Sequence, residues 1–345
     1  KDGDTALHQA AHNGDTETVK TLLDNLTPDQ QLELLSTQNK DGNTALHKAV
    51  RMGHTEIVKI LLDNLTPEQQ LKLLSEQSKE QLLSEQDKNG DTALHRAALH
   101  GCTETAKTLL DNLTPEQQLK LLLTQNIDGD TALHKAVRIR HTEIPEQQLQ
   151  LLLTQDFENN TAVHDAACHV RTETVKTLLA DLTPEQQLEL LLTQNRHGDT
   201  ALHAAARQGQ TESVKSLLDN LTSEQQLQLF VTQDKKGNTA LHDAACRGLT
   251  RTAVALLDNL TPEQQLKLLS TQNKNGNTAL HCAAQEGKKV TQNNLGYYDE
   301  NLVTITTLEQ YQIEADFRVF RICAILFINF VLCMTLIHVI LLDYS

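Results

Sequence analysis

Apolar and polar residues follow one another along the chain in three short patterns that keep returning. Residues 44–50, TALHKAV, carry small and apolar residues that suit a short helix. Residues 55–64, TEIVKILLDN, place apolar residues at i, i+1, i+4 and i+5, which is one buried stripe of a second helix. Residues 114–122, TPEQQLKLL, add leucines after a polar start. The patterns predict three short helices per repeat and an all-α fold.

The predicted helices carry start and stop signals. The first opens on a threonine, a favourable N-cap, after an Asp-Gly or Asn-Gly pair, and closes at a glycine such as Gly53 or Gly101. The third opens on Thr114, with Pro115 at the first helical position and Gln117 three residues after the cap. Because helices this short are unstable alone, neighbouring repeats must bury their apolar faces.

The repeat period follows from the tetrapeptide T-A-L/V-H, which starts at Thr5, Thr44, Thr92, Thr131, Thr161, Thr200, Thr239 and Thr278. The successive spacings are 39, 48, 39, 30, 39, 39 and 39 residues. The long spacing contains a near-duplicate, LLSEQSKEQLLSEQ, at 73–86, and the short one lacks a counterpart of VKILLDNLT. We therefore predict an array with repeats at 1–39, 40–87, 88–126, 127–156 (shortened), 157–195, 196–234, 235–273 and 274–287 (partial).

The shortened repeat 127–156 has lost most of its second helix in this interpretation. A gap or bend is expected there, because the second helix packs on both neighbours. The array would then behave as two blocks, 1–126 and 157–287.

Residues 41–62, DGNTALHKAVRMGHTEIVKILL, resemble the ankyrin repeat, whose signature runs G-x-T-P-L-H-x-A-A-x-x-G-H-x-E-I-V-x-L-L-L. Two departures stand out: alanine replaces the proline of T-P-L-H in every repeat, and the usual period of 33 becomes 39. The resemblance implies an ankyrin-type helical solenoid that binds proteins through its concave face and loops. We expect the extra helix to replace the short hairpin loop between repeats.

Eight of the fifteen histidines occupy one repeat position, namely His8, His47, His95, His134, His164, His203, His242 and His281. Eight equivalent residues are not eight active sites. The resemblance implies that this histidine forms hydrogen bonds within and between repeats. Metal binding needs ligands that converge on one point, and this histidine recurs once per repeat, so no metal site is predicted.

Composition and motifs narrow the function further. The formal charge of −15 argues against nucleic acid as a partner. The six cysteines are scattered without a C-x-x-C pair, as in a reduced compartment. The sequence has no G-x-S-x-G, P-loop or H-E-x-x-H motif. We therefore predict no enzyme activity, no cofactor and no small-molecule substrate.

Positions on the outer side of the first helix vary between repeats, and in repeats two to four several are basic. These residues are Lys48, Arg51, Arg96, Lys135 and Arg138. One hypothesis is that this basic stripe contacts an acidic segment of a partner protein. The alternative is ordinary variation of surface residues.

The composition changes after the array. Residues 288–316 suggest a polar linker, and 317–345 suggest a membrane-anchor helix. Within it, Ile322 to Leu342 are 21 residues without a formal charge, about 31 Å as a helix, which matches the thickness of a bilayer. Residues expected in the membrane include Ile322, Leu326, Phe330, Leu336 and Leu342. The alternatives are a hydrophobic helix that caps the last repeat and a non-native tail.

The sequence thus predicts a non-enzymatic protein-binding scaffold, tethered to a membrane by its C-terminal helix. Arg318 and Arg321 precede the apolar stretch, which places the array in the cytoplasm by the positive-inside rule. If the helix does not insert, we expect a soluble cytoplasmic protein. Two alternatives stay open: a fragment of a multi-span ankyrin-bearing channel or transporter, and an effector of an intracellular microbe that binds host proteins.

Overall fold

The structure is a computed structural model that describes residues 2–24, 26–63, 80–111, 113–139, 149–169, 171–258 and 260–286. The predicted linker 288–316 and the apolar stretch 322–342 lie outside these residues. The chain divides into two compact units, Lys1–Gln186 and Gln187–Ser345. The division falls within a helix, α14 (Pro184–Leu192), and not at the shortened repeat where we expected a break.

The described helices are of three kinds, as the sequence predicts. The first helices are α1 (Ala6–Asn13), α4 (Ala45–Arg51), α7 (Ala93–His100), α10 (Ala132–Arg138) and α12 (Ala162–Cys168), followed in the second unit by α15 (Ala201–Gln208) and α18 (Ala240–Cys246). The second helices are α2 (Thr16–Leu23), α5 (Thr55–Asp63), α8 (Thr103–Leu110), α13 (Thr172–Leu179), α16 (Thr211–Leu218) and α19 (Thr250–Ala255). The third helices are α3 (Pro28–Ser36), α9 (Pro115–Leu123), α11 (Leu149–Leu153), α14, α17 (Ser223–Val231) and α20 (Pro262–Ser270).

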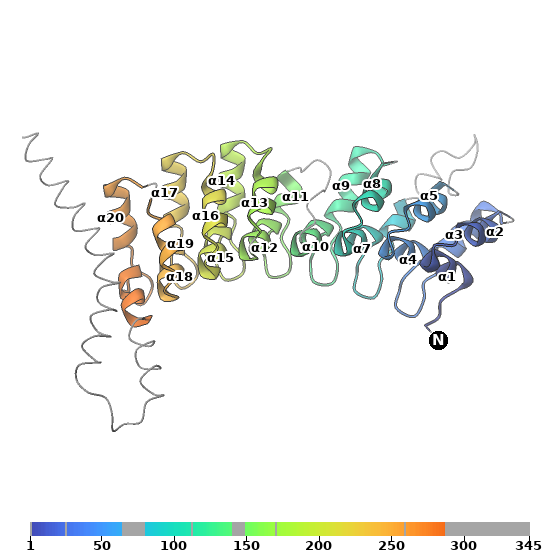
Figure 1. The fold of residues 1–345 in the computed structure, drawn as a ribbon, viewed down its shortest axis with the longest axis horizontal. Coiled ribbons are helices and arrows are strands. Elements are labelled where there is room, and N and C mark those ends of the chain that lie inside the picture. The colour runs from blue at the N-terminus through green and yellow to red at the C-terminus, as the bar shows by residue number, and fades with distance from the viewer. Residues whose placement is uncertain are drawn as a thin grey trace, which may run out of the picture. The chain divides into compact units, whose positions relative to one another are not determined.

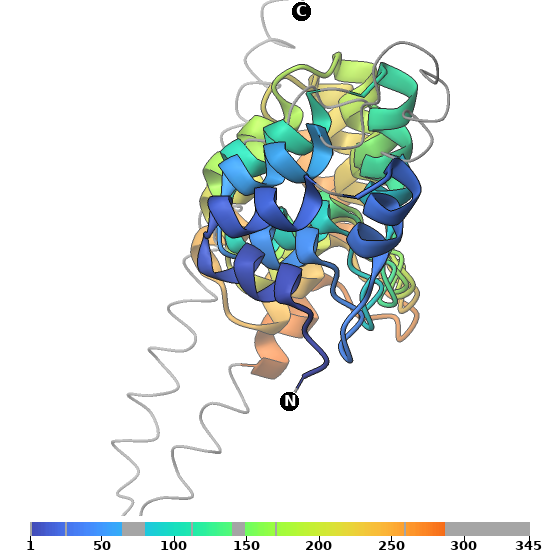
Figure 2. The same ribbon diagram turned by 90° about the vertical axis from the view of Figure 1, so that its right-hand side faces the viewer.

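Like helices pack on like helices within each compact unit. In the first unit α1 contacts α4, α4 contacts α7, and α7 contacts α10, so that the first helices form one row (Figure 1). Turned by 90°, the blue and teal helices of consecutive repeats lie behind one another (Figure 2). The core lies between the rows, where Leu46, Ala49, Ile57 and Leu61 are fully buried. Burial of these stripes supplies the stability that the single helices lack.

The first helix begins with an unusual capping box. In α4 the side chain of Thr44 accepts a hydrogen bond from the backbone N–H of His47, and Nδ1 of His47 accepts one from the backbone N–H of Thr44. Histidine therefore stands where Glu or Gln usually completes the box. The predicted stop at a glycine is present too, since Gly101 follows α7 with φ +67°.

The Gln-Gln pair explains how the third helix is attached. In α9 the first glutamine, Gln117, completes a capping box with Thr114. The second, Gln118, donates from Nε2 to the carbonyl oxygen of Leu110 at 2.9 Å, at the end of α8. The pair thus satisfies orphan groups at the start of the third helix and at the end of the second.

The third helix does not replace the loop between repeats, contrary to our expectation. A turn still follows it, and residues 37–44 run from α3 to α4 without helix. In that turn Oδ1 of Asn39 accepts hydrogen bonds from the backbone N–H groups of Asp41 and Asn43, each at 2.9 Å. The longer period therefore adds a helix before a retained loop.

Consecutive loops lie against one another through their backbones. The N–H of Lys88 donates to the carbonyl oxygen of Asp41 at 3.0 Å, and the N–H of Ile127 donates to that of Asn89 at 3.1 Å. Glutamines add a second link, because Nε2 of Gln86 donates both to the carbonyl of Gly90 in its own loop and to that of Gln125 in the next.

This approach requires glycine at the turn. Gly90 has φ +71°, and a Cβ there would lie 2.7 Å from the backbone nitrogen of Ile127 in the next loop. Glycine is thus needed both for the left-handed backbone and for space. Asn159 replaces glycine at this position of its own loop and keeps φ at +61°, a conformation that asparagine tolerates.

Candidate partner-binding face

Some buried positions of the first helices repeat, whereas positions next to them vary. Leucine and histidine after the capping threonine are buried in α4, α7 and α10. The position after the histidine is exposed in the first repeat, buried in the fifth and half-buried in the others, and it carries Gln9, Lys48, Arg96, Lys135, Asp165, Ala204 and Asp243. Repeating residues thus build the scaffold, and the variable ones distinguish one repeat from the next.

The repeated histidine links consecutive repeats. Nε2 of His47 lies 3.0 Å from the carbonyl oxygen of Asp91, and that of His95 lies 2.9 Å from the carbonyl oxygen of Asp130. The same contact to the next loop occurs at His8, His134, His203 and His242. For His164 and His281, the contact described here is a different one: Nδ1 lies at hydrogen-bond distance from the hydroxyl of the capping threonine in the same repeat.

These contacts fix the protonation state of the ring. Nδ1 of His47 accepts from the N–H of Thr44, and Nε2 faces a carbonyl oxygen, which only accepts. The ring must therefore be neutral with its proton on Nε2. Burial lowers the pKa of His47, His95 and His242 below the ordinary value of 6.5, although the carbonyl contact favours the charged form.

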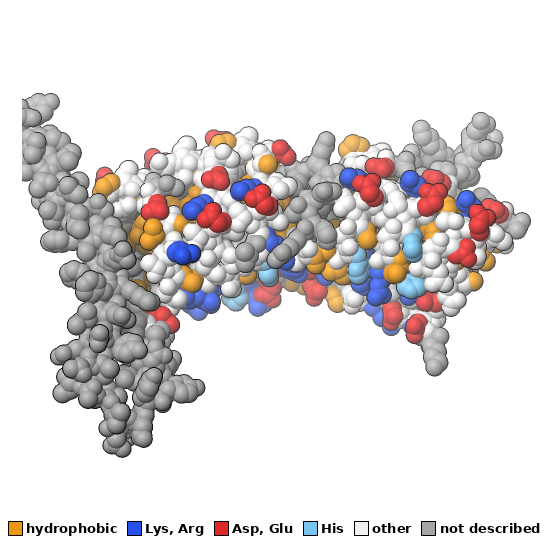
Figure 3. Space-filling view, viewed as in Figure 1, with side chains coloured by type: hydrophobic (Ala, Val, Ile, Leu, Met, Phe, Trp, Pro, Cys, Tyr) orange, Lys and Arg blue, Asp and Glu red, His pale blue; other side chains and the backbone are white. Residues whose placement is uncertain are grey.

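Four of the five cations in the predicted basic stripe are held by aspartates. Lys48 Nζ lies 3.3 Å from Asp4, and Lys135 Nζ lies 3.3 Å from Asp130. Arg96 pairs with Asp87, whose side chain is only 1% exposed. Basic, acidic and histidine side chains therefore share the lower edge of the N-terminal part (Figure 3).

Arg138 is the centre of the largest group. Its guanidinium lies 2.6 Å from Asp130, 2.8 Å from Asp165 and 3.2 Å from Asp156. Although burial opposes it, these carboxylates hold the pKa of Arg138 above its usual value. Burial raises the pKa of Asp165, which the guanidinium partly offsets. One cation thus joins two loops to α12.

The sign of the charge on this face differs from the sequence-based interpretation. The four paired cations contact six aspartates, Asp4, Asp87, Asp91, Asp130, Asp156 and Asp165, so the group carries 4 − 6 = −2 in its ordinary ionisation states. Arg51, the fifth member, is exposed at the end of α4, and within the described ranges no ion pair involves it. The five residues thus belong to one row of helices, but they do not form a free basic stripe.

A related group in the second compact unit was not predicted. Arg207 of α15 lies 2.6 Å from Asp199 and 2.7 Å from Asp243 of α18. Burial would raise the pKa of Asp199, but hydrogen bonds from Arg207 lower it. The sequence signal is the Asp before the capping threonine, as in GDT, because Asp4, Asp91, Asp130 and Asp199 all take part.

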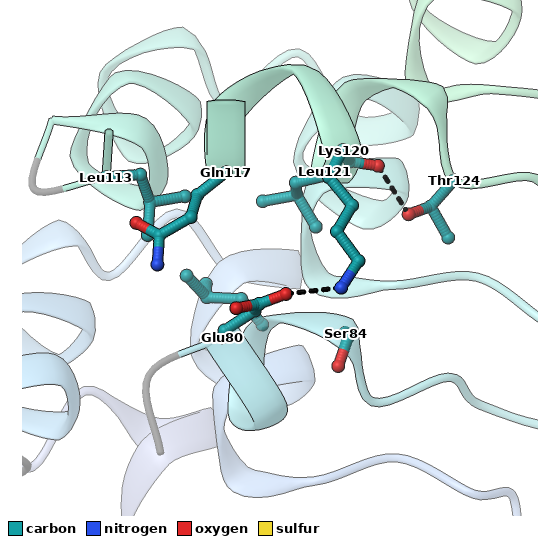
Figure 4. Close-up of a pocket in the computed structure, with 8 residues that line it drawn as sticks. Glu80, Ser84, Leu113, Gln117, Lys120, Leu121 and Thr124 are labelled. Carbon is teal, nitrogen blue, oxygen red and sulfur yellow. Dashed lines mark hydrogen bonds and ion pairs between the residues drawn. The ribbon is translucent and has the colours of Figure 1, made fainter. Parts of the chain in front are cut away.

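A small hollow lies elsewhere, between α9 and the helical segment 80–84. Leu83, Leu113 and Leu121 line it, and Lys120 pairs with Glu80 across it (Figure 4). Its lining holds one ion pair and no histidine, cysteine or aspartate.

The described ranges hold neither a metal-binding cluster nor a helix suited to span a membrane. They contain no cluster of three or more His, Cys, Asp or Glu that could hold a metal ion. Nor does any helix in them have both the length and the apolar character that a bilayer crossing needs. The residues predicted to lie in the membrane, from Ile322 to Leu342, are outside those ranges.

Models of a known family agree with the repeat architecture. A family model described as "Ankyrin repeats (3 copies)" matches residues 1–73, 184–267 and 227–293, and a second, "Ankyrin repeats (many copies)", matches 94–153. Among solved structures, the crystal structure of the ankyrin repeat domain of Bcl-3, a member of the IkappaB family, is 23% identical. It covers 82% of this chain and 95% of its own, with a TM-score of 0.46. No curated protein matches the chain.

The neutral histidines predict a pH dependence of stability. Because the pKa of His47, His95 and His242 is lower in the folded chain than in the unfolded one, the unfolded chain binds more protons as pH falls below about 6.5. The free energy of unfolding should therefore decrease between about pH 7.5 and pH 5.5, as measured by the urea midpoint. The raised pKa of Asp165 and Asp243 acts in the opposite direction, nearer the ordinary value of 3.8.

Two variants test whether the buried histidines cause this pH dependence. His95→Asn should remove part of the pH dependence, whereas His12→Asn, at an exposed position of α1, should leave it unchanged. A midpoint that is the same at both pH values would show that the buried histidines do not control stability.

Proposed function

The chain belongs to the ankyrin repeat family, and we propose that it is a non-enzymatic scaffold that binds a partner protein through the exposed, variable positions of its first helices and the loops between repeats. One observation carries the proposal: positions that build the stack recur in each repeat, and the positions facing solvent on the same helices do not. Such a surface can recognise one partner without altering the scaffold.

The first compact unit offers the clearest set of variable exposed positions. Gln9, Arg51, Met52 and His100 are exposed on α1, α4 and α7 or directly after α4. Met52 is 46% exposed, and methionine adapts well to an apolar partner surface. These side chains are free to contact a partner without breaking the buried hydrogen bonds of the stack.

A second, more specific proposal concerns the charge of the partner segment. An acidic segment that contacts Lys48, Arg51, Arg96, Lys135 and Arg138 must compete with the aspartates that already pair with four of them. Arg51 is the member of this set that an acidic segment reaches at the lowest cost, because its charge is exposed. We therefore assign the acidic contact to Arg51.

The test compares two sets of four substitutions in the full chain. Changing Gln9, Arg51, Met52 and His100 to Ala should abolish capture of partner proteins in proximity labelling, with little change in melting temperature. Changing Lys20, Lys59, Lys107 and Lys176 to Ala, on exposed faces of the second helices, should leave capture intact. Equal capture by both variants would contradict the proposed face.

A single substitution added to this experiment tests the charge. Arg51→Glu should weaken capture more than Arg51→Ala, by about threefold or more at low salt, if the partner segment is acidic. If the two variants capture alike, the acidic contact is wrong while the binding face stands.

We also propose that residues 317–345 tether the scaffold to a membrane with the array on the cytoplasmic side. The support is the sequence of Ile322 to Leu342, which is apolar on all sides, whereas a helix that caps a repeat array needs a polar outer face. The full chain should float with lipid vesicles after an alkaline wash, and a chain ending at residue 316 should stay in the dense fractions. A full chain that also stays dense would exclude the tether.

A further inference from the structure

One loop position changes its chemistry in two consecutive repeats. The residue after the Asn or Asp that opens each turn is Lys40, Lys88, Ile127, Phe157, Arg196, Lys235 or Lys274. Five loops carry a cation there, and the two that flank the shortened repeat carry an apolar residue. Ile127 is 59% exposed and Phe157 is 67% exposed.

The turn itself does not require an apolar residue. In the Ile127 loop, Oδ1 of Asn126 accepts from the N–H groups of Asp128 and Asp130, each at 2.9 Å. In the loop of Lys40, Oδ1 of Asn39 accepts from the two equivalent N–H groups at the same distance. Because both residue types fit one backbone geometry, the apolar side chains have another role or none.

The two apolar residues lie on adjoining loops. The N–H of Phe157 donates to the carbonyl oxygen of Asp128, next to Ile127, at 3.1 Å. The Phe157 ring also rests against Gly129, since a Cβ built on that glycine would lie 2.6 Å from Cδ1 of the ring. The Phe157 ring therefore packs against the backbone at Gly129, while most of the residue's surface faces solvent. A supported aromatic loses little conformational freedom on binding.

Two acidic residues adjoin this pair in the sequence, since Asp128 follows Ile127 and Glu158 follows Phe157. Asp128 is exposed and Glu158 is half-buried. The other carboxylates of the three loops 86–91, 125–130 and 155–160 are buried and pair with cations of the first helices; they are Asp87, Asp91, Asp130 and Asp156. An apolar spot beside acidic residues favours an apolar side chain with cationic neighbours.

We propose that Ile127 and Phe157 form an apolar anchor pair that holds one large apolar side chain of a partner segment, with Lys or Arg next to that side chain. This inference rests on the proposed protein-binding function and assigns it a contact point. The anchor pair is separate from Arg51, and it requires cationic neighbours where the Arg51 contact requires acidic ones. The two assignments therefore concern different parts of a partner.

The probe is a library of random 12-residue peptides displayed on phage and selected against the full chain. Selected peptides should share one large apolar residue beside Lys or Arg. In the Ile127→Ser/Phe157→Ser variant their affinity should fall about tenfold or more, as expected for the loss of central apolar contacts. Lys88→Ser changes the same position of the preceding loop and should leave the affinity within about twofold.

Melting temperatures of the three proteins should agree, because the substituted side chains are exposed and the turn bonds are made by backbone and Asn or Asp. Higher salt should weaken binding to the wild type, since the cationic neighbours face carboxylates.

Other results overturn the inference. Peptides that bind the wild type and the double serine variant equally would remove the anchor pair and leave the scaffold function standing. Selected peptides without an apolar residue, or with acidic neighbours, would remove the stated chemistry. Dimerisation of the wild type that the double variant lacks would identify a second copy as the occupant instead. No enrichment over a blank surface, together with no partner capture, would count against the scaffold function itself.

Discussion

The close contact between the loops of consecutive repeats is the constraint on which the rest of the structure depends. Within each compact unit, consecutive loops approach closely enough for one backbone hydrogen bond, as between Ile127 and Asn89, and for a histidine bond from the first helix, as between His95 and Asp130. Short helices cannot be stable alone, so a repeat acquires its structure by docking on a neighbour. The contacts between loops set the register in which repeats dock, and the buried leucines and alanines pack in that register.

The same constraint determines the electrostatics. Where an Asp precedes the capping threonine, stacking brings it next to cations of its own or a neighbouring first helix, as Asp91 lies next to Arg96 and Lys135. Most of the positive charge on the first helices is therefore used inside the stack. In the described part of the first compact unit, what remains for a partner is the exposed Arg51, the variable uncharged positions and the loop tips. A binding surface of this kind depends more on individual residues than on a continuous charge.

Much of the scaffold could be predicted from the sequence because its signals are local. Threonine caps, the Thr-Pro start of the third helix and the apolar stripes each lie within one repeat, and the helices appear where these predict them. The ion pairs could not be predicted in the same way. Lys48 and Asp4 are 44 residues apart, and only the stacking of repeats brings them together. The loop was misjudged for a different reason: its turn residues, as in NKDGN, were visible at 39–43, but the extra helix was expected to replace the loop instead of preceding it.

The most direct test of the loop contact compares two glycines at the same repeat position. Gly90 and Gly276 have φ +71° and +75°; a Cβ on Gly90 meets the next loop at 2.7 Å, and one on Gly276 meets nothing within 4 Å in the described part of the chain. Both alanine variants bear the cost of a left-handed backbone, about 1–2 kcal/mol. Gly90→Ala must also push the loops apart, so urea unfolding should show a loss of about 3–5 kcal/mol for it, against about 1–2 kcal/mol for Gly276→Ala. Equal losses would contradict the claim that loop contact holds the repeats together.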